Sequence, residues 1–291
     1  MHRLIPRPAL WRNVWLALVA VSVHAGSALA QGHGPAYGLA TPTLGRGDWS
    51  LDVGVMGRIV EDAHAVMLRA MVSYGITADL QVSLSLPMPL DVRPGVPPAR
   101  GFARMPSSPD IEWMVGWRFD REGTAVGKRR ESTVWLGFDY PTDAVRAGVR
   151  TAPGLVAGVV TGYASRTVYI WGGALYRRYM TLRGPGSDHP GDAALASLVL
   201  GYRPSAFRDD VPKPDWRVFL ELLAEHTARD RIAGLVREDS GGDQLFAALT
   251  VLGLYGSWGL SGGPAIPVAR SMNGAQPRER ARFVINTTFW F

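Results

Sequence analysis

Histidines near carboxylates are the side chains best suited to catalysis in this sequence, and His226 is the best placed of them. It ends a segment that also carries Glu221 and Glu225. A histidine oriented by a carboxylate is two parts of a Ser-His-Asp triad, in which the imidazole takes the proton from a serine nucleophile. No serine is placed beside His226 by the sequence, so a hydrolytic site is an alternative and not the main prediction.

The remaining histidines do not form a metal site in the sequence. His33 lies between glycine residues, and His64 and His189 lie in segments that we expect to be loops, so each supplies a single ligand. A metal site needs three or four converging ligands. Gly123–Arg130 contains two glycines and a lysine but lacks the spacing of a phosphate-binding loop. We predict no catalytic residue, no metal, no cofactor and no enzyme activity.

Charged residues inside alternating segments form a second group. If those segments are β-strands, the charges fall on the faces opposite the apolar ones. Such residues either form a salt-bridged network that only holds the fold together or line a polar path. The members of this group are Arg69, Glu112, Arg118, Asp139, Arg217, Glu221 and Glu225.

The strands that must position these side chains are indicated by apolar residues at every second position. Leu80–Leu86 alternates strictly, and Ile111–Phe119 places two tryptophans and a phenylalanine on one face. Lipid accepts such a face more readily than water does. The same test predicts twelve strands, at 49–58, 65–74, 80–87, 110–119, 131–140, 155–164, 167–179, 193–202, 216–226, 244–254, 258–267 and 281–291.

The N-terminus has the features of a secretory signal. Residues 1–12 carry three arginines and no acid, 14–23 are apolar apart from one serine, and 28–30 match the cleavage rule. We predict a cleaved signal peptide at 1–30 and a single domain at 31–291. Removing three arginines from the 31 basic residues leaves 28 against 25 acidic ones, so the charge gives no reason to expect nucleic-acid binding.

Composition agrees with a barrel that spans a membrane with strands. The chain is 47% hydrophobic, yet its mean hydropathy is only +0.02, and no stretch after the signal approaches the ~18 apolar residues of a helical span. A transmembrane barrel dilutes lipid-facing residues with polar lumen residues at alternate positions. The chain has no cysteine, which excludes disulfides and a lipidated cysteine.

Loop lengths support the same fold. With both termini on the periplasmic side, the odd-numbered connections face outward, and most of them are long and rich in Pro, Gly and charge. Short inner turns and long outer loops are typical of bacterial outer-membrane barrels. We predict an all-β, closed antiparallel transmembrane barrel of about twelve strands, with ten or fourteen as alternatives; a secreted β-sandwich is the rival fold.

The strand that ends at Phe291 has an apolar face that runs to the terminus. As the closing strand it pairs with the first strand and leaves no open edge. Alternating aromatics with a final phenylalanine also resemble the signal that marks such barrels for assembly. We therefore expect contact with outer-membrane lipid, and with the barrel-assembly machinery through the strand ending at Phe291.

Several segments resemble the large family of outer-membrane β-barrel transporters related to the phenol-degradation meta-pathway proteins. They are GPAYGLATPTLGRGDWS, YGITADLQVSLSLP, VTGYASRTVYIWGGALYRRY, PKPDWRVFLE and VLGLYGSWGLSGG. The turn YGIT-DL and the strand after it are the most specific. The resemblance implies a barrel and the passage of small molecules, often assumed to be hydrophobic. It carries no catalytic motif and transfers no site residue.

The main functional prediction is a Gram-negative outer-membrane channel or transporter for a small molecule. The charged group above and the proline-rich loop 88–109 are expected to set its selectivity, the loop by folding inward or by capping the outer mouth. Two alternatives remain: an outer-membrane lipid-modifying enzyme that uses His226, and a barrel with only a structural or surface-interaction role. The solute, its direction, the oligomeric state and whether the lumen is open or plugged are not predicted.

Overall fold

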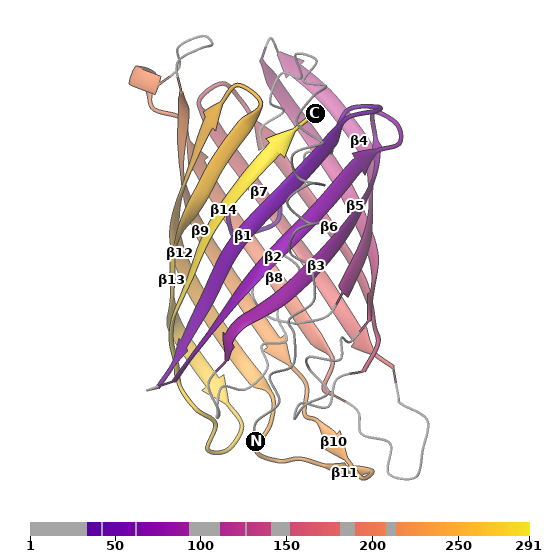
Figure 1. Ribbon diagram of the computed structural model, residues 1–291, viewed down its shortest axis with the longest axis vertical. Helices are drawn as coiled ribbons and strands as arrows, with labels where there is room; N and C mark the ends of the chain where they lie inside the picture. Colours follow the sequence, from indigo (N-terminus) through magenta and orange to yellow (C-terminus); the bar gives the residue numbers. More distant parts are fainter. Residues whose placement is uncertain are drawn as a thin grey trace, which may run out of the picture.

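The computed structural model describes residues 34–41, 43–61, 63–92, 111–125, 127–140, 152–180, 190–207 and 214–291. The predicted signal at 1–30, His33, His189 and residues 93–109 of the predicted selectivity loop lie outside the described residues. The described chain forms a closed antiparallel barrel with strongly tilted strands (Figure 1).

Twelve strands close the barrel, in the order β1-β14-β13-β12-β9-β8-β7-β6-β5-β4-β3-β2. The predicted number of strands is confirmed, and so is the fold class. The described strands close into one barrel and do not form two packed sheets, so the β-sandwich is excluded. The strands are β1 (Trp49–Val60), β2 (Ala63–Gly75), β3 (Leu80–Val92), β4 (Ile111–Ala125), β5 (Lys128–Tyr140), β6 (Gly154–Ala164), β7 (Val168–Tyr179), β8 (Ala193–Tyr202), β9 (Asp215–Thr227), β12 (Gly242–Tyr255), β13 (Trp258–Met272) and β14 (Glu279–Trp290).

Two predicted connections belong to strands in the structure. The segment 120–130, predicted as a long inner loop, is a continuation of β4 and β5, which pair as far as Ala125 and Lys128. The predicted loop 88–109 starts too early, because β3 continues through Pro89 to Val92 and pairs with β2 across a register shift. Both errors arose where the apolar alternation stops before the hydrogen-bonded ladder does.

Small elements fill two of the remaining connections. The strands β10 (Arg231–Ile232) and β11 (Leu235–Val236) form a hairpin between β9 and β12, at the end of the barrel opposite the C-terminal residue (Figure 1). The short 3-10 helix η2 (Ser205–Phe207) lies between β8 and β9. Among the described residues, no helix is long and apolar enough to span a membrane.

First and last strands join by a continuous ladder. Ser50 pairs with Trp290, and the register holds until a shift between Ile59 and Val60. Beyond the ladder, the N–H of Trp49 donates to the carbonyl of Phe291 at 3.1 Å, and the N–H of Phe291 donates back at 3.0 Å. Every strand of the barrel therefore has two hydrogen-bonded neighbours, which removes the sheet edge.

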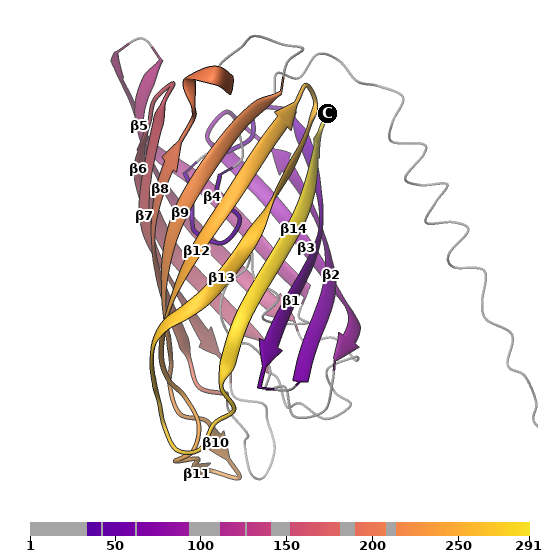
Figure 2. The same cartoon turned by 90° about the vertical axis from the view of Figure 1, so that its left-hand side faces the viewer.

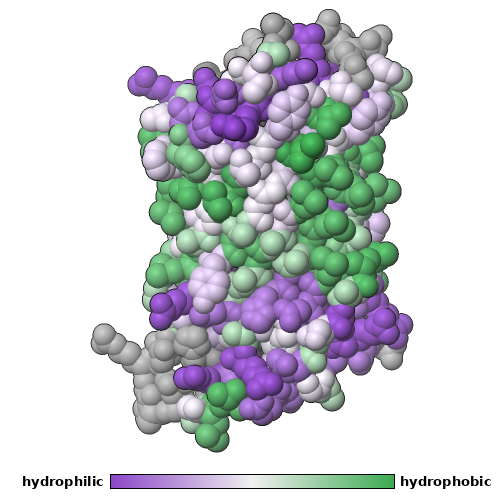
Figure 3. Space-filling model, turned by 180° about the vertical axis from the view of Figure 1, so that it is seen from behind, coloured by the Kyte–Doolittle hydropathy of each residue, from purple (hydrophilic) through white to green (hydrophobic). Residues whose placement is uncertain are grey.

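The outer wall carries an apolar belt between two polar ends, as Figure 3 shows for one face. Leu249 and Ile285 on this wall are each 60% exposed, and Trp113 and Trp117 are each more than half exposed. A soluble protein would not leave so many large apolar side chains in water, whereas hydrocarbon favours them. The belt is therefore the lipid-facing surface that the strand alternation predicts.

The core lies inside the barrel and includes a segment that the strand analysis did not place there. Residues 34–48 precede β1, and Figure 2 shows this indigo part of the chain within the outline of the barrel. Tyr37, Leu39 and Leu44 are buried in one cluster with wall residues such as Trp171 and Phe219. We call the described residues of this stretch, 34–41 and 43–48, the inner segment.

Candidate functional site

The inner segment is held to the wall of the lumen by one carboxylate. Glu221 on β9 is completely buried, and it accepts the backbone N–H groups of Ala36 at 3.0 Å, Tyr37 at 2.9 Å and Gly38 at 2.5 Å. It also accepts the hydroxyl of Thr250. Successive N–H groups that point into one concavity form an anion-binding nest. The carboxylate supplies that anion, so it fixes the segment without a salt bridge.

Further contacts of the segment extend the attachment to three other strands. The hydroxyl of Tyr37 donates to the carbonyl of Gly263 on β13 at 2.8 Å, and the N–H of Leu39 donates to Ser197 Oγ on β8 at 3.1 Å. Farther along, the N–H of Leu44 donates to the Gln81 side chain on β3 at 2.9 Å. These contacts span the lumen from side to side.

Thr41 provides a further fixed point. Its carbonyl accepts the hydroxyl of Thr133 at 2.8 Å, and its own Oγ1 accepts the indole N–H of Trp171 at 3.1 Å. The Thr41 hydroxyl also reaches Glu131 at 3.3 Å. Buried polar groups of the segment are thus satisfied by wall side chains, as a stable packed conformation requires.

One group of ion pairs links β2, β4, β5 and β7 on the inner face of the barrel. Arg177 contacts Glu112 at 2.9 Å and Asp139 at 2.6 Å, while Arg69 contacts Glu112 at 3.3 Å. Two arginines therefore balance two carboxylates. The charges neutralise one another inside the barrel and stiffen the wall that they share.

A second balanced group lies beside the closure of the barrel. Arg58 on β1 contacts Glu279 on β14 at 2.9 Å, and Arg282 contacts both Glu279 and Glu225, the latter at 2.5 Å. The guanidinium of Arg282 also lies 3.8 Å from the ring centre of Phe246. The group joins the first strand, the last strand and β9.

Further pairs lie toward the opposite end of the barrel. Arg118 contacts Glu131 at 2.9 Å and Asp79 at 2.8 Å. Arg217 contacts Asp215 at 2.8 Å, and Arg203 contacts the same carboxylate at 2.7 Å. The interior is therefore lined by arginine–carboxylate groups along most of its length.

All seven charged residues singled out from the sequence lie on the interior side of the barrel. Glu112, Arg118, Asp139 and Glu221 are buried, and the side chains of Arg69, Arg217 and Glu225 are at most 13% exposed. The alternation gave no indication that six of them pair with other charges or that Glu221 binds the inner segment. It also left unmarked three charged residues that pair with members of this group, Glu131, Arg177 and Arg282. Arg58 and Glu279, which form ion pairs beside Arg282, were unmarked as well.

His226 is not grouped with Glu221 and Glu225. It lies on the outward face of β9, because successive residues of a strand point to opposite sides, and its side chain is 57% exposed. The acid beside it is therefore neither Glu221 nor Glu225. Its Nδ1 instead lies 2.7 Å from Asp243 on β12, and Ser271 on β13 pairs with Asp243 on the far side. The carboxylate thus separates this serine from the imidazole.

A serine motif overlooked in the sequence has the wrong surroundings for a nucleophile. Gly259–Gly263 reads G-x-S-x-G, a pattern that in hydrolases forms a strained turn between a strand and a helix. Here Ser261 lies within β13 and faces the lumen. The second described histidine, His64 on β2, has its Nε2 2.9 Å from Oδ2 of Asp91 on β3. Within the described chain, neither histidine is hydrogen-bonded to a serine.

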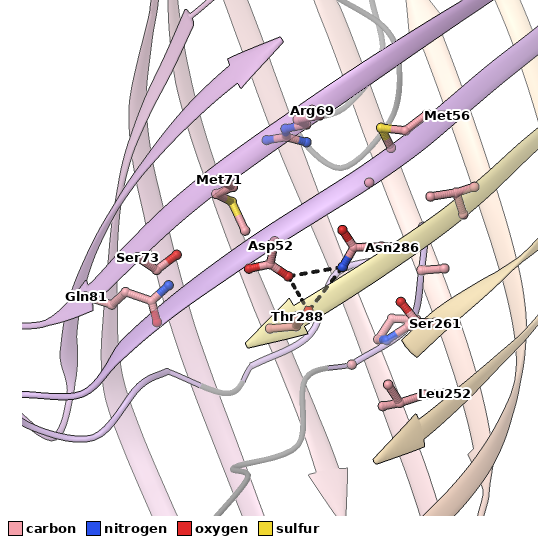
Figure 4. Close-up of a pocket in the computed structure, with 15 residues that line it drawn as sticks. Asp52, Met56, Arg69, Met71, Ser73, Gln81, Leu252, Ser261, Asn286 and Thr288 are labelled. Atoms are coloured by element: carbon pink, nitrogen blue, oxygen red, sulfur yellow. Dashed lines mark hydrogen bonds between the residues drawn. The ribbon is translucent and has the colours of Figure 1, made fainter. Parts of the chain in front are cut away.

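Between the inner segment and the closure of the barrel lies a crevice with about 70 Å³ of free space. Gly34, Pro35 and Ala36 form one side of it. The other side comes from β1, β2, β3, β12, β13 and β14, and Figure 4 shows that Asp52, Asn286 and Thr288 are linked by hydrogen bonds on this wall. Beside the inner segment, the described residues therefore leave a crevice with both polar and apolar lining along one wall.

Comparisons with known proteins show likeness at the level of the fold. No protein-family model matches the chain, and no curated protein matches its sequence. An outer-membrane channel from Pseudomonas putida F1 superposes with a TM-score of 0.63 at 12% identity, covering 86% of this chain and 98% of that one. The NanC porin superposes with a TM-score of 0.53 at 10% identity, covering 82% of this chain and 98% of that one.

Both structures share the barrel architecture with this chain, which has the fold of an outer-membrane β-barrel. At these identities the likeness describes the fold and does not extend to a solute or to individual residues.

Proposed function

We propose that the protein is a channel or transporter in the outer membrane of a Gram-negative bacterium, and that it passes a small solute through its lumen. The apolar belt supports contact with outer-membrane lipid. The strand ending at Phe291 is the proposed contact with the barrel-assembly machinery. The inner segment is the proposed constriction of the channel; most of the loop 88–109 that the sequence suggested lies outside the described residues.

The observation that carries this proposal is the attachment of Ala36, Tyr37 and Gly38 to Glu221. A barrel of twelve strands has a wider interior than the eight-stranded kind that wall side chains fill, so a segment attached in this way sets the width of any path past it. The segment is held by wall side chains and not by a strand ladder, so it can shift to admit a solute while the barrel strands stay hydrogen-bonded to one another.

The polar part of the crevice wall favours a solute that carries a polar group. Serine, threonine, asparagine and ion-paired groups line the wall, and burying an apolar molecule against them would remove water from polar groups without replacing its hydrogen bonds. This preference differs from the hydrophobic solutes that the family resemblance suggests.

Planar-bilayer recordings of the native protein and of Glu221→Gln test the proposal. Glutamine replaces one acceptor oxygen by an NH₂ group, which cannot accept the N–H groups of the segment. We expect a higher conductance or a longer open time in Glu221→Gln. The control is Glu225→Gln, which lies on the same face of β9 but contacts Arg282 and not the segment.

Two outcomes would exclude a channel. A native barrel that passes no current, and that still passes none after deletion of residues 36–41, has only a structural or surface role. The lipid-modifying alternative rests on the His226–Asp243 pair; it would be supported by lipid hydrolysis that is lost in His226→Ala, with Glu221→Gln unaffected.

A further inference from the structure

Asp52 differs from the other carboxylates inside the barrel. Glu112, Glu131, Glu225 and Glu279 each contact an arginine, and Asp139 contacts Arg177. Glu221 has three backbone N–H donors instead. For Asp52, on the interior face of β1, the described residues provide no salt bridge at all, although it lies in the same charge-balanced interior.

The two oxygens of Asp52 have different surroundings. Oδ1 accepts the amide of Asn286 at 3.1 Å and the hydroxyl of Thr288. Oδ2 is buried and has no hydrogen-bond partner, and neither has the buried Oγ of Ser50, two residues earlier on the same face. In Figure 4 the second oxygen points away from Asn286 and Thr288. One acceptor of a charged group is therefore left over beside the crevice.

The cationic side chain in the crevice lining does not balance the charge of Asp52. Arg69 lines the same crevice, but its guanidinium donates to Ser85 Oγ at 3.0 Å and contacts Glu112 at 3.3 Å. An ionised carboxylate that is removed from bulk water and left unpaired is costly unless a counter-ion or donor joins it. Oδ2 therefore has room for a further hydrogen-bond donor, and a positively charged donor would also balance an ionised Asp52.

The walls of the crevice define which cation fits. Its free space of about 70 Å³ holds a few water-sized groups, and Met56, Met71, Leu252 and Val284 line it beside the polar residues. Asp52 is the only carboxylate among the lining residues, so a divalent metal would lack ligands. No aromatic ring lines the crevice, so it also lacks the ring faces that recognise quaternary ammonium groups.

From these features we infer that the crevice is a binding site for small primary amines in their protonated form. The ammonium group lies at Asp52, where its N–H donors meet Oδ2, and the short alkyl part lies against the methionine and aliphatic side chains. This inference rests on the proposed function, because it assigns the solute class to the constriction. Asp52 is then the residue that selects the solute.

The first experiment measures block of potassium current by n-propylammonium in planar bilayers. We expect block in the native channel, loss of block in Asp52→Asn, and retained block in Thr288→Val, which keeps the charge but removes one hydroxyl donor. Asp243→Asn is the matched control, because it makes the same change on the exposed outer face. Tetramethylammonium should block weakly. Equal block of the native channel and Asp52→Asn would overturn the inference.

The second experiment does not depend on conduction. The temperature at which the detergent-solubilised barrel loses its folded gel mobility is measured in propylammonium chloride and in potassium chloride of equal ionic strength. Binding to the folded state raises this temperature. We expect a rise with propylammonium in the native protein that is absent in Asp52→Asn; an equal effect of potassium would overturn the assignment to amines.

The two readouts separate the two proposals. A propylammonium-specific rise that depends on Asp52, in a barrel that passes no current, would establish the amine site and refute the channel. The opposite outcome is a conducting barrel in which Asp52→Asn changes neither the block by propylammonium nor its effect on the unfolding temperature. That outcome would refute the amine site and would still support the channel.

Discussion

The carboxylate of Glu221 lies against the backbone of Tyr37, whose N–H donates to Oε2 over 2.9 Å although 184 positions separate the two residues. One residue in the middle of β9 therefore determines where the chain before β1 lies. The contact is made to backbone and not to a side chain, so its strength depends on how closely the inner segment approaches the wall.

Gly38 tests this close approach. A Cβ at this position would lie 2.4 Å from Val199 Cγ2 and 3.3 Å from Glu221 Oε2. We expect Gly38→Ala to push the segment from the wall and to raise the single-channel conductance. Gly123→Ala is the control, since a Cβ there meets nothing within 4 Å. Unchanged conductance in Gly38→Ala would show that the segment does not limit the current.

A disulfide tests whether the segment moves during conduction. Leu39 and Ser197 are joined by a hydrogen bond of 3.1 Å, and the natural chain has no cysteine that would compete. In the double variant Leu39→Cys and Ser197→Cys, we expect oxidation to lower the conductance and reduction to restore it. Each single variant controls for the substitution alone. A channel that conducts equally in both redox states needs no movement at this point.

Neighbouring residues of β14 should face different solvents. Ile285 is 60% exposed on the outer wall, whereas Asn286 lines the crevice. We expect Asn286→Cys to react with a charged, water-soluble thiol reagent and Ile285→Cys to react only with a reagent that partitions into lipid. Mass spectrometry of the labelled protein in liposomes measures both. Reaction of both cysteines with the charged reagent would contradict a lipid-facing belt.

Removing Arg282 should destabilise the barrel. Arg282 is buried between Glu225 and Glu279. The variant Arg282→Met therefore leaves Glu225 without its arginine partner and leaves Glu279 paired with Arg58 alone. Breaking one side of a buried ion pair lowers the free energy of unfolding by about 3 kcal/mol or more, measured here by urea unfolding in lipid vesicles. Arg270→Met, at an exposed position, should change it by much less. Equal effects would mean that the pairs are effectively solvated.

The strands were predictable because lipid and lumen impose a period of two on each of them. In Ile111–Phe119 the tryptophans and the arginine fall on opposite faces, and burial alternates in the same way. The prediction ended too early at residue 119, because the continuation of β4 to Ala125 is exposed on both faces. Where both faces meet water, hydrogen bonding continues but the hydrophobic pattern does not.

The site was less accessible to sequence reasoning. The inner segment has no period, because wall side chains and not a neighbouring strand bind its backbone. Pairing of Glu221 with residues 36–38 is a long-range contact that no local pattern encodes. Asp52 did have a signal: Ser50, Asp52 and Arg58 alternate with apolar residues of β1. Applying the lumen test to the first strand would have included it.

The salt bridge between Arg58 and Glu279 favours a single register between β1 and β14 when the barrel closes. These residues lie near facing positions of β1 and β14, 221 residues apart in the chain. A slip of one residue would turn every side chain of a strand to the other surface, which would place this guanidinium in hydrocarbon and abandon the carboxylate inside. Closure in a wrong register is therefore opposed by the cost of burying these unpaired charges, so the charge pair selects the correct alignment of the first and last strands.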